Sequence, residues 1–540
     1  MVATFQKQSR AGVALGATCA ALGAAAAYAW YYQRHECRRP DLYFKDGSEM
    51  MVRVLRACPL LQEPYRPTFW ATNPHVQTMM SVLRKLSIRA NFRRHLLPAP
   101  DGGTVGLDFF DGCDEYDWPA DTPVLLLIHG LAGSSEDGYA KWMAATATSK
   151  GWRAAILNYR GAGGVPLTSC HVSSAAFTGD IHLALQFLSG LFPGAPLLAC
   201  GYSMGGLMLT KYLAEADSGE WGGGARLAAA AVVSSPFCPA ASNARLSQAW
   251  SAPWCYNVGL TRLFLRQFCF AHRATLAAGR SVPLDLDSLA SANTMDAFIE
   301  RVICKVYHHA TPTLDEYFSA ARAHRHIPAI RTPTLFLGAA DDPFLGNLPL
   351  EEAAANPYTL LALTSRGGHV GFLSGAVPLG RVWMDDVVAQ FLAAAASAAP
   401  PRPPAAKPSP AAVQAKAAGA AAATGLRPGR RCASEACLVS MQMCAPSAKS
   451  SLPAGKGGAL AIVAEALAAE TAVPPPPPST PPRFAAAAAL NPENPVTELW
   501  LRAPAGLAAA ANSVASARSQ RNWGSAGGGP AGRMCRNQSF

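Results

Sequence analysis

Between about Met51 and Ala393, short runs of apolar residues alternate with longer stretches in which apolar residues recur at helical spacing. Each short run is bounded by proline, glycine or charged residues, which is typical of strands buried on both faces of a parallel sheet. The best strand candidates are Val124–Ile128, Ala154–Leu157, Leu197–Cys200, Ala230–Ser234, Thr334–Leu337 and Thr359–Leu363. The alternation predicts an α/β protein with a mostly parallel sheet and helices on both faces.

The length of the chain, 540 residues, exceeds what one hydrophobic core usually organises, so we expect a folded body over residues 51–395 with appendages. From about residue 396 the composition turns to alanine, proline and serine, with a proline run over residues 474–478. Because little large apolar surface is present there to offset chain entropy, residues 396–540 are predicted to be a disordered, low-complexity tail.

The N-terminal segment has three interpretations. Residues 12–32 contain no charged side chain and, at helical rise, are about long enough to cross the core of a bilayer. The segment ends in side chains that settle at lipid interfaces, Tyr28, Trp30, Tyr31 and Tyr32. Residues 1–50 are therefore predicted to hold a single-pass membrane anchor. The basic, acid-free start also suits a transit peptide for a chloroplast or mitochondrion, or a secretory signal, and a soluble helix stays open because alanine and glycine dominate.

The formal net charge is +11, but lysine and arginine are scattered rather than gathered into one stripe. This distribution argues against nucleic-acid binding and fits loose attraction to anionic lipid. The 14 cysteines run from Cys19 to Cys535 without paired spacing, so we expect reduced thiols. We expect neither a metal site nor a cofactor, because the cysteines of the tail have no histidine or fourth cysteine near them.

The most specific motif is Gly201-Tyr202-Ser203-Met204-Gly205, which follows one strand candidate and precedes a helix-like stretch. Such a turn projects a serine hydroxyl from the carboxyl edge of the sheet, and the glycines make room for its strained backbone. Ser203 is therefore the candidate nucleophile. The candidate oxyanion-hole donors are the backbone N–H groups of Met204 and of Leu131, which lies in the loop after residue 128. His129 is interpreted as a residue that shapes this loop.

A serine hydroxyl needs a base within hydrogen-bond reach and a third group that orients the base. In an α/β hydrolase the acid and then the histidine follow the nucleophile along the chain. His369, between Gly367-Gly368 and Gly371, is the candidate base. Asp341 and Asp342 compete for the role of the acid, and Asp342 is favoured because Phe344 follows it as an apolar anchor two positions on.

Three further blocks accompany these motifs: residues 69–78 (FWATNPHVQT), residues 129–139 (HGLAGSSEDGY) and residues 158–161 (NYRG). Together the blocks make residues 64–392 resemble the membrane-anchored AB-hydrolase-domain family of serine hydrolases. That family includes bacterial YheT-type hydrolases, plant embryogenesis-associated hydrolases and mammalian phospholipase-like abhydrolases. The 69–78 block is the signature of that family. Because the residue types of the block indicate no catalytic chemistry, we predict that its role is structural packing.

The resemblance implies the α/β-hydrolase fold and a carboxylic ester hydrolase acting on lipid-like or medium-chain acyl esters. It places the nucleophile, acid and base of the family on Ser203, Asp342 and His369, and it implies membrane attachment through an N-terminal helix.

Residues 236–331 separate two strand candidates by more than an ordinary connection and contain helix-like stretches. We therefore expect a helical cap insertion over the site. The aromatic residues that would line an acyl pocket, or else pack in an ordinary core, are Trp250, Trp254, Phe264 and Phe270.

Ester hydrolysis through an acyl-enzyme is the leading function. Acyl transfer to an alcohol would use the same residues and stays open as an alternative. A hydrolase fold that only binds its ligand is less favoured because no member of the triad is missing. An epoxide hydrolase or dehalogenase of this fold would carry aspartate at position 203. The sequence determines neither the natural substrate nor the oligomeric state.

Overall fold

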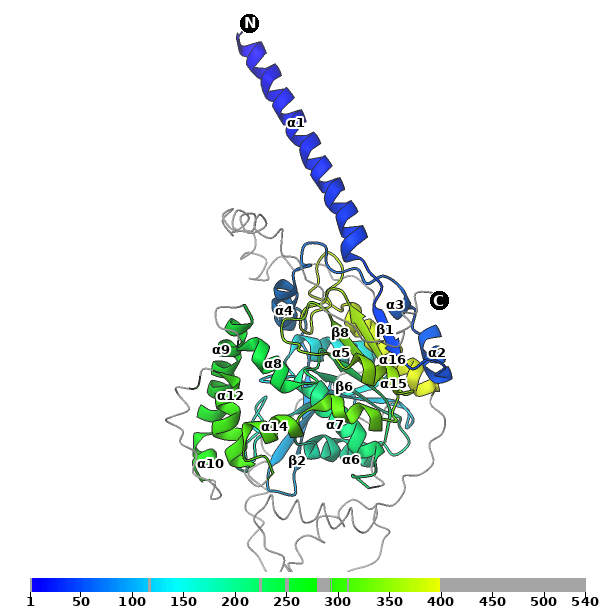
Figure 1. The fold of residues 1–540 in the computed structure, drawn as a ribbon, viewed down its shortest axis with the longest axis vertical. Coiled ribbons are helices and arrows are strands. Elements are labelled where there is room, and N and C mark those ends of the chain that lie inside the picture. The colour runs from blue at the N-terminus through cyan, green and yellow to red at the C-terminus, as the bar shows by residue number, and fades with distance from the viewer. Residues whose placement is uncertain are drawn as a thin grey trace, which may run out of the picture. The chain divides into compact units, whose positions relative to one another are not determined.

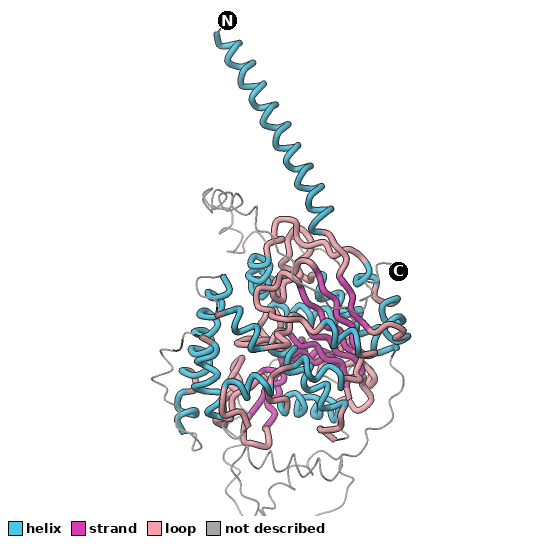
Figure 2. Tube along the Cα trace, viewed as in Figure 1, coloured by secondary structure: helices cyan, strands magenta, loops and turns pink. Residues whose placement is uncertain are grey.

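A 9-stranded sheet lies at the centre of the described part of the chain (Figures 1 and 2). The computed structural model describes residues 2–114, 118–222, 226–247, 252–278, 292, 294–307 and 310–398, so the predicted tail lies outside it apart from residues 396–398. The strand order is β1-β9-β8-β7-β6-β4-β5-β3-β2. The strands are β1 (Asp41–Phe44), β2 (Phe92–Pro98), β3 (Thr104–Phe110), β4 (Val124–Ile128), β5 (Arg153–Asn158), β6 (Leu197–Tyr202), β7 (Leu227–Val233), β8 (Thr334–Ala339) and β9 (Thr359–Thr364).

The six strands from β4 to β9 pair in parallel, and each overlaps one of the predicted strands, which confirms the mostly parallel sheet. The antiparallel strands β1, β2 and β3 at the two edges were not predicted. Most side chains of β2 are at least partly exposed, so this strand lacks the continuous apolar run by which a buried strand is recognised.

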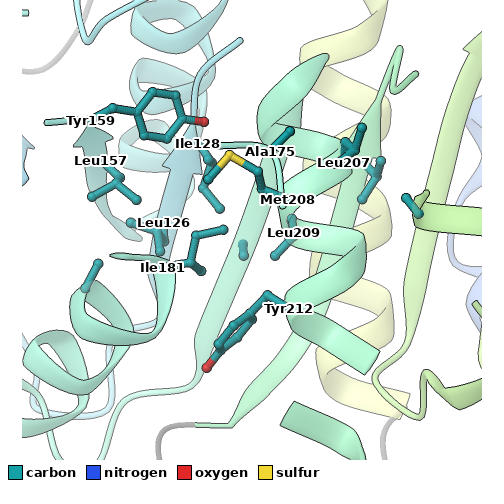
Figure 3. Packing of buried hydrophobic residues seen from close by; sticks show 14 of the residues in the cluster. Leu126, Ile128, Leu157, Tyr159, Ala175, Ile181, Leu207, Met208, Leu209 and Tyr212 are labelled. Carbon is teal, nitrogen blue, oxygen red and sulfur yellow. The ribbon is translucent and has the colours of Figure 1, made fainter. Parts of the chain in front are cut away.

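Each strand contributes side chains to two cores, because successive residues point to opposite faces of the sheet. In β4, Leu126 and Ile128 enter one core, whereas Leu125 and Leu127 enter the other. Helices α6 (Gly179–Leu191) and α7 (Met204–Asp217) cover the first face, which Figure 3 shows. The second face is covered by α2 (Glu49–Arg56), α5 (Gly138–Ser149) and α16 (Trp383–Ala398). Helices on both faces are thus confirmed.

The insertion between β7 and β8 is helical, as predicted. Its described helices are α8 (Pro239–Leu246), α9 (Ala252–Phe264), η3 (Leu265–Phe270), α10 (Arg273–Ala278), α12 (Met295–Phe298), η4 (Ile299–Ile303), α13 (Cys304–Val306), α14 (Leu314–Ala320) and η5 (Ala323–Ala329). Outside the insertion lie α3 (Pro59–Gln62), α4 (Pro74–Leu83), η2 (Arg84–Ser87) and α15 (Leu350–Ala355). Figure 1 shows α9, α10 and α12 grouped beside the sheet.

The predicted membrane-spanning anchor is not supported. Helix α1 (Val2–Tyr31) includes nearly all of the segment, and η1 (Tyr32–Glu36) follows it. No helix among the described residues combines the length and the apolar character needed to cross a membrane. The physical reason is the alanine and glycine content of α1, because these side chains contribute little transfer free energy. The alternative of a transit peptide stays a prediction.

Helix α4 and η2 are fixed to the body by a buried ion pair. The Arg84 guanidinium and the Asp385 carboxylate of α16 are hydrogen-bonded, and both side chains are fully buried. Arg84 also donates from Nε to the carbonyl oxygen of Gly380, at 3.1 Å. Removing one member would leave the other charge buried without its partner, which typically costs about 3–5 kcal/mol.

We therefore expect Arg84→Met to lower the free energy of unfolding by about 3–5 kcal/mol at pH 7, measured by denaturant titration. The double variant Arg84→Met/Asp385→Leu removes both charges and should recover much of this loss. The matched control is Arg381→Met, since its ion pair with Asp386 is exposed and is worth under about 1 kcal/mol. A loss in Arg84→Met no larger than in the control would contradict the prediction.

Candidate active site

Ser203 occupies a strained turn between β6 and α7. Its backbone has φ 52° and ψ −119°, a conformation that non-glycine residues rarely adopt. Its N–H donates to the carbonyl oxygen of Val233 at 2.9 Å, which ties the turn to the neighbouring strand. At Gly205 a Cβ atom would lie 2.4 Å from the carbonyl oxygen of Ile128, so no other residue fits there. The spacing of the motif is thus explained by close packing of the turn against β4.

His369 lies between Ser203 and Asp342, three residues brought from three separate loops. Its Nε2 is 2.9 Å from Ser203 Oγ, and its Nδ1 is 2.9 Å from Asp342 Oδ2. The Asp342 carboxylate is buried, and its Oδ1 accepts the N–H of Phe344 at 2.8 Å. The Phe344 ring stacks on the imidazole with a centroid distance of 4.3 Å. The apolar residue that favoured Asp342 in the sequence therefore packs directly on the histidine.

Asp341 points elsewhere. Its Oδ1 accepts the N–H of Gly368 at 3.0 Å, and its Oδ2 is 3.9 Å from Arg366 Nη1, which is too long for a hydrogen bond. Burial raises the pKa of the Asp341 carboxyl to about 6. Of the two competing carboxylates, the one that contacts His369 is Asp342, and Asp341 instead holds the loop that carries His369.

The raised pKa of Asp341 makes a prediction about stability. Its ordinary pKa is 3.8, so the folded protein binds the proton more tightly than the unfolded chain. The wild-type protein consequently loses stability as the pH rises from about 4 to about 6, and the loss persists above that range. Asp341→Asn keeps the acceptor for Gly368 and abolishes the titration. Its stability relative to wild type should rise by about 1–2 kcal/mol between pH 4 and pH 7. Unfolding titrations at both pH values check this, and a pH-independent difference would contradict it.

The loop after β4, which contains Leu131, passes close to Ser203. A Cβ atom on Gly130 would lie 3.2 Å from Ser203 Cβ, so this loop passes close to the nucleophile. The Gly130 N–H donates to the Tyr139 hydroxyl at 3.0 Å, and that hydroxyl donates to Asp137 Oδ2 at 2.8 Å. Leu131, the next residue, lines the same cavity as Ser203.

Met204 is the first residue of α7, so its N–H is one of those that have no acceptor within the helix. Met204 also lines the cavity. His129 is buried, its Nδ1 is 2.8 Å from the carbonyl oxygen of Gly130, and burial lowers its pKa. A neutral ring held in this way suits the predicted role of shaping the loop.

A cavity of about 770 Å³ opens at Ser203 and His369. Its other walls are mostly apolar and come largely from the insertion, including Leu260, Phe264, Phe298, Ile299, Ile303, Tyr317 and Phe318. Of the aromatic residues proposed as lining, Phe264 lines the cavity, whereas Phe270 does not and is 44% exposed. Trp250 and the side chain of Trp254 lie outside the described residues. The described residues contain no group of histidine, cysteine or carboxylate side chains that could hold a metal ion.

The signature block does more than the packing that the sequence predicted. Thr78 Oγ1 accepts the N–H of His369 at 2.9 Å, and Gln77 Oε1 accepts the N–H of Leu373 at 2.9 Å. At Gly368 a Cβ atom would lie 2.4 Å from the carbonyl oxygen of Pro74, so the histidine loop rests directly on α4. Asn73 accepts the His75 N–H and begins this helix. The block positions His369, and only its long-range contacts reveal this.

We expect Thr78→Val to lower kcat by about 10–100-fold, because the backbone N–H of His369 loses its acceptor and the imidazole shifts. KM should change much less. Thr78→Ser keeps the hydroxyl and is the matched control, expected to retain most of the activity. Steady-state kinetics on a soluble ester measure both parameters. Equal kcat values for the two variants would mean that this hydrogen bond does not position the histidine.

The chain matches known hydrolases over most of its described length. Residues 120–356 match the hydrolase family model described as serine aminopeptidase, S33. Phospholipase ABHD3 of Mus musculus is 33% identical over 379 residues, covering 69% of this chain and 88% of that protein. Embryogenesis-associated protein EMB8 of Picea glauca is 29% identical, covering 67% and 78%. YheT of Escherichia coli (strain K12) is 28% identical, covering 59% and 90%.

The sheet is mostly parallel, and a strained turn at Ser203 joins β6 to α7. Together with these matches, this architecture defines a hydrolase of the α/β-hydrolase fold. The chain belongs to the AB-hydrolase family of ABHD3, EMB8 and YheT. The resemblance inferred from the motifs is thereby confirmed, apart from membrane anchoring.

Proposed function

We propose that the protein cleaves carboxylic esters of lipid-like or medium-chain acyl substrates through an acyl-enzyme formed on Ser203. The observation that carries the proposal is the hydrogen-bonded series Asp342, His369 and Ser203, of which His369 and Ser203 line a mostly apolar cavity. Ester hydrolysis by serine requires this combination of nucleophile, base and orienting carboxylate.

In the first half of the reaction, Ser203 Oγ attacks the acyl carbonyl carbon while His369 Nε2 takes the hydroxyl proton. The bond to the leaving oxygen then breaks, and His369 returns the proton to the departing alcohol. In the second half, water attacks the acyl carbon and gives a proton to His369. The bond between the acyl carbon and Ser203 Oγ then breaks, His369 returns the proton to Oγ, and the carboxylic acid is released. Asp342 keeps Nδ1 protonated and stabilises the imidazolium in both halves.

The negative charge of each tetrahedral intermediate would be held by the backbone N–H groups of Met204 and Leu131. The position of Met204 at the start of α7 supports this role, since the helix dipole also favours negative charge there. Such donors act in the transition state and so raise kcat rather than substrate affinity.

The preference for apolar acyl groups rests on the cavity walls. Phe298, Ile303 and Tyr317 are buried side chains of the insertion that border the cavity, and they offer an acyl chain apolar contacts along its length. The name of the relative ABHD3, a phospholipase, supports a lipid ester as the substrate class.

The experiment that tests the proposal is covalent labelling with a fluorophosphonate ester, with the adduct located by mass spectrometry. The reagent reacts preferentially with an activated serine, so the expected result is one main adduct on Ser203 that is absent in Ser203→Ala. Labelling should also be much slower in His369→Ala, because the base is missing. A folded protein that is not labelled, judged by its unfolding transition, would overturn the proposal.

A further inference from the structure

Helix α4 and η2 have an inverted arrangement of polar and apolar side chains. The polar residues Gln77, Thr78, Ser81 and Arg84 are buried against the body. The apolar residues Val76, Met79, Val82, Leu83 and Leu86, spaced at helical intervals, are exposed. We name this second set the α4 apolar face. An ordinary surface helix has the opposite orientation, so the folding of the described residues does not account for this face.

The α4 apolar face is continuous with the entrance of the cavity. Met79 and Val82 belong to the face and also border the cavity that contains Ser203 and His369. Leu263 of α9 borders the cavity and is exposed as well. Apolar side chains therefore lead from the surface of the protein into the cavity, which is the path that a poorly soluble acyl ester needs.

Aromatic side chains extend the exposed apolar surface. Phe69 and Trp70, just before α4, are about half exposed. The hydroxyl of Tyr28, near the end of α1, donates to the carbonyl oxygen of Phe69, and the next residues of α1 include the exposed Trp30 and Tyr31. Tryptophan and tyrosine are the side chains that favour the boundary between lipid and water.

The charge around the face is positive. Residues 64–100 contain no aspartate or glutamate, and their exposed cations include Arg66, Lys85 and Arg89. Glu136 also borders the cavity, but it forms an ion pair with Lys141 at 2.8 Å. Cations beside exposed apolar side chains complement a surface that is apolar within and anionic outside, which is the surface of an anionic bilayer.

We propose that the α4 apolar face docks the protein on an anionic lipid surface, so that the cavity opens against the membrane from which the ester enters. Docking is peripheral and requires no spanning helix. The entry of substrate by this path rests on the proposed function, whereas docking itself does not.

The test measures binding of the full chain to vesicles by co-sedimentation, in a Ser203→Ala background so that no lipid is cleaved. The vesicles are phosphatidylcholine, with or without phosphatidylserine. Leu83→Glu/Leu86→Glu places two charges on the face without touching the cavity lining, since these residues are 41% and 62% exposed and do not border it. Leu96→Glu is the matched control, because Leu96 is 51% exposed on the edge strand β2.

We expect the double variant to bind phosphatidylserine vesicles at least about tenfold more weakly, while Leu96→Glu binds like the parent. Binding of the parent should strengthen with phosphatidylserine and weaken with salt. Unchanged binding by the double variant, or an equal loss in Leu96→Glu, would overturn the proposal. So would a lipid-free dimer that the double variant dissociates, seen by sedimentation velocity, because the face would then bind a second copy.

Fluorophosphonate labelling of the same substitutions on the Ser203 background separates this proposal from the proposed function. Retained labelling in Leu83→Glu/Leu86→Glu, with lost vesicle binding and slower cleavage of vesicle-embedded but not soluble esters, supports both. Absence of labelling in every protein, with vesicle binding still dependent on the face, would overturn the catalytic proposal and leave docking supported.

Discussion

Replacing Ser203 with alanine is expected to lower kcat for ester hydrolysis by about 10⁴ to 10⁶-fold. The hydroxyl is the group 2.9 Å from His369 Nε2, and alanine leaves no atom that can form the acyl-enzyme. The change removes one oxygen at a partly buried turn, so the unfolding midpoint should hardly move. Hydrolysis of a chromogenic short-chain ester by the full chain measures the rate.

The same experiment shows whether Ser203 and His369 act as a unit. His369→Ala should lower kcat by a similar factor. The double variant Ser203→Ala/His369→Ala should be no slower than either single variant, because both groups serve one proton transfer. Multiplicative losses would mean that the two residues act independently. A Ser203→Ala protein that keeps more than about a tenth of the activity would require a different nucleophile.

Replacing Asp342 with asparagine is expected to lower kcat by about 10⁴-fold with little change in KM. The carboxylate accepts from Nδ1 of His369, at 2.9 Å from Oδ2, and so keeps Nε2 free to take the serine proton. An amide at this position can donate its own N–H to Nδ1, which favours the wrong tautomer.

Asp341→Asn is the matched control, because it makes the same chemical change one residue away. Its Oδ1 contacts the N–H of Gly368, and the amide oxygen of asparagine can accept that bond equally well. We expect less than about a tenfold loss in kcat. The reverse ranking of the two variants would show that Asp341 is the acid that orients the histidine.

The parallel strands were predictable because burial on both faces demands a continuous apolar run, and such a run is a local property of the chain. The nucleophile turn was predictable for a similar reason. Glycine is required at position 201 because a Cβ atom there would clash with Gly205, and at position 205 because a Cβ atom there would clash with Ile128 of β4. The edge strands β1 and β2 were missed because a strand with exposed side chains needs no such run. Strand β3 is mostly buried, but Gly106 and Asp108 interrupt its apolar residues.

The N-terminal segment shows the limit of a pattern. Absence of charge over residues 12–32 suggested an anchor, yet the helix that forms there is too weakly apolar to span a membrane. Charge and length are visible in a sequence at a glance, but insertion depends on the summed transfer free energy of the side chains, and alanine and glycine add little.

The sequence by itself determined the α/β class, the approximate positions of the strands that form the parallel sheet, the family, and the identities of the serine and histidine candidates. Each of these rests on periodicity or on motifs that lie within one short segment. Only the tertiary structure decided which aspartate contacts His369, that Gln77 and Thr78 hold its loop, and that α4 presents an apolar face at the cavity entrance. The contacts of Thr78 and Gln77 join residues 291 and 296 positions apart. Such contacts depend on how distant elements pack against one another, which the spacing of residues within one segment does not specify.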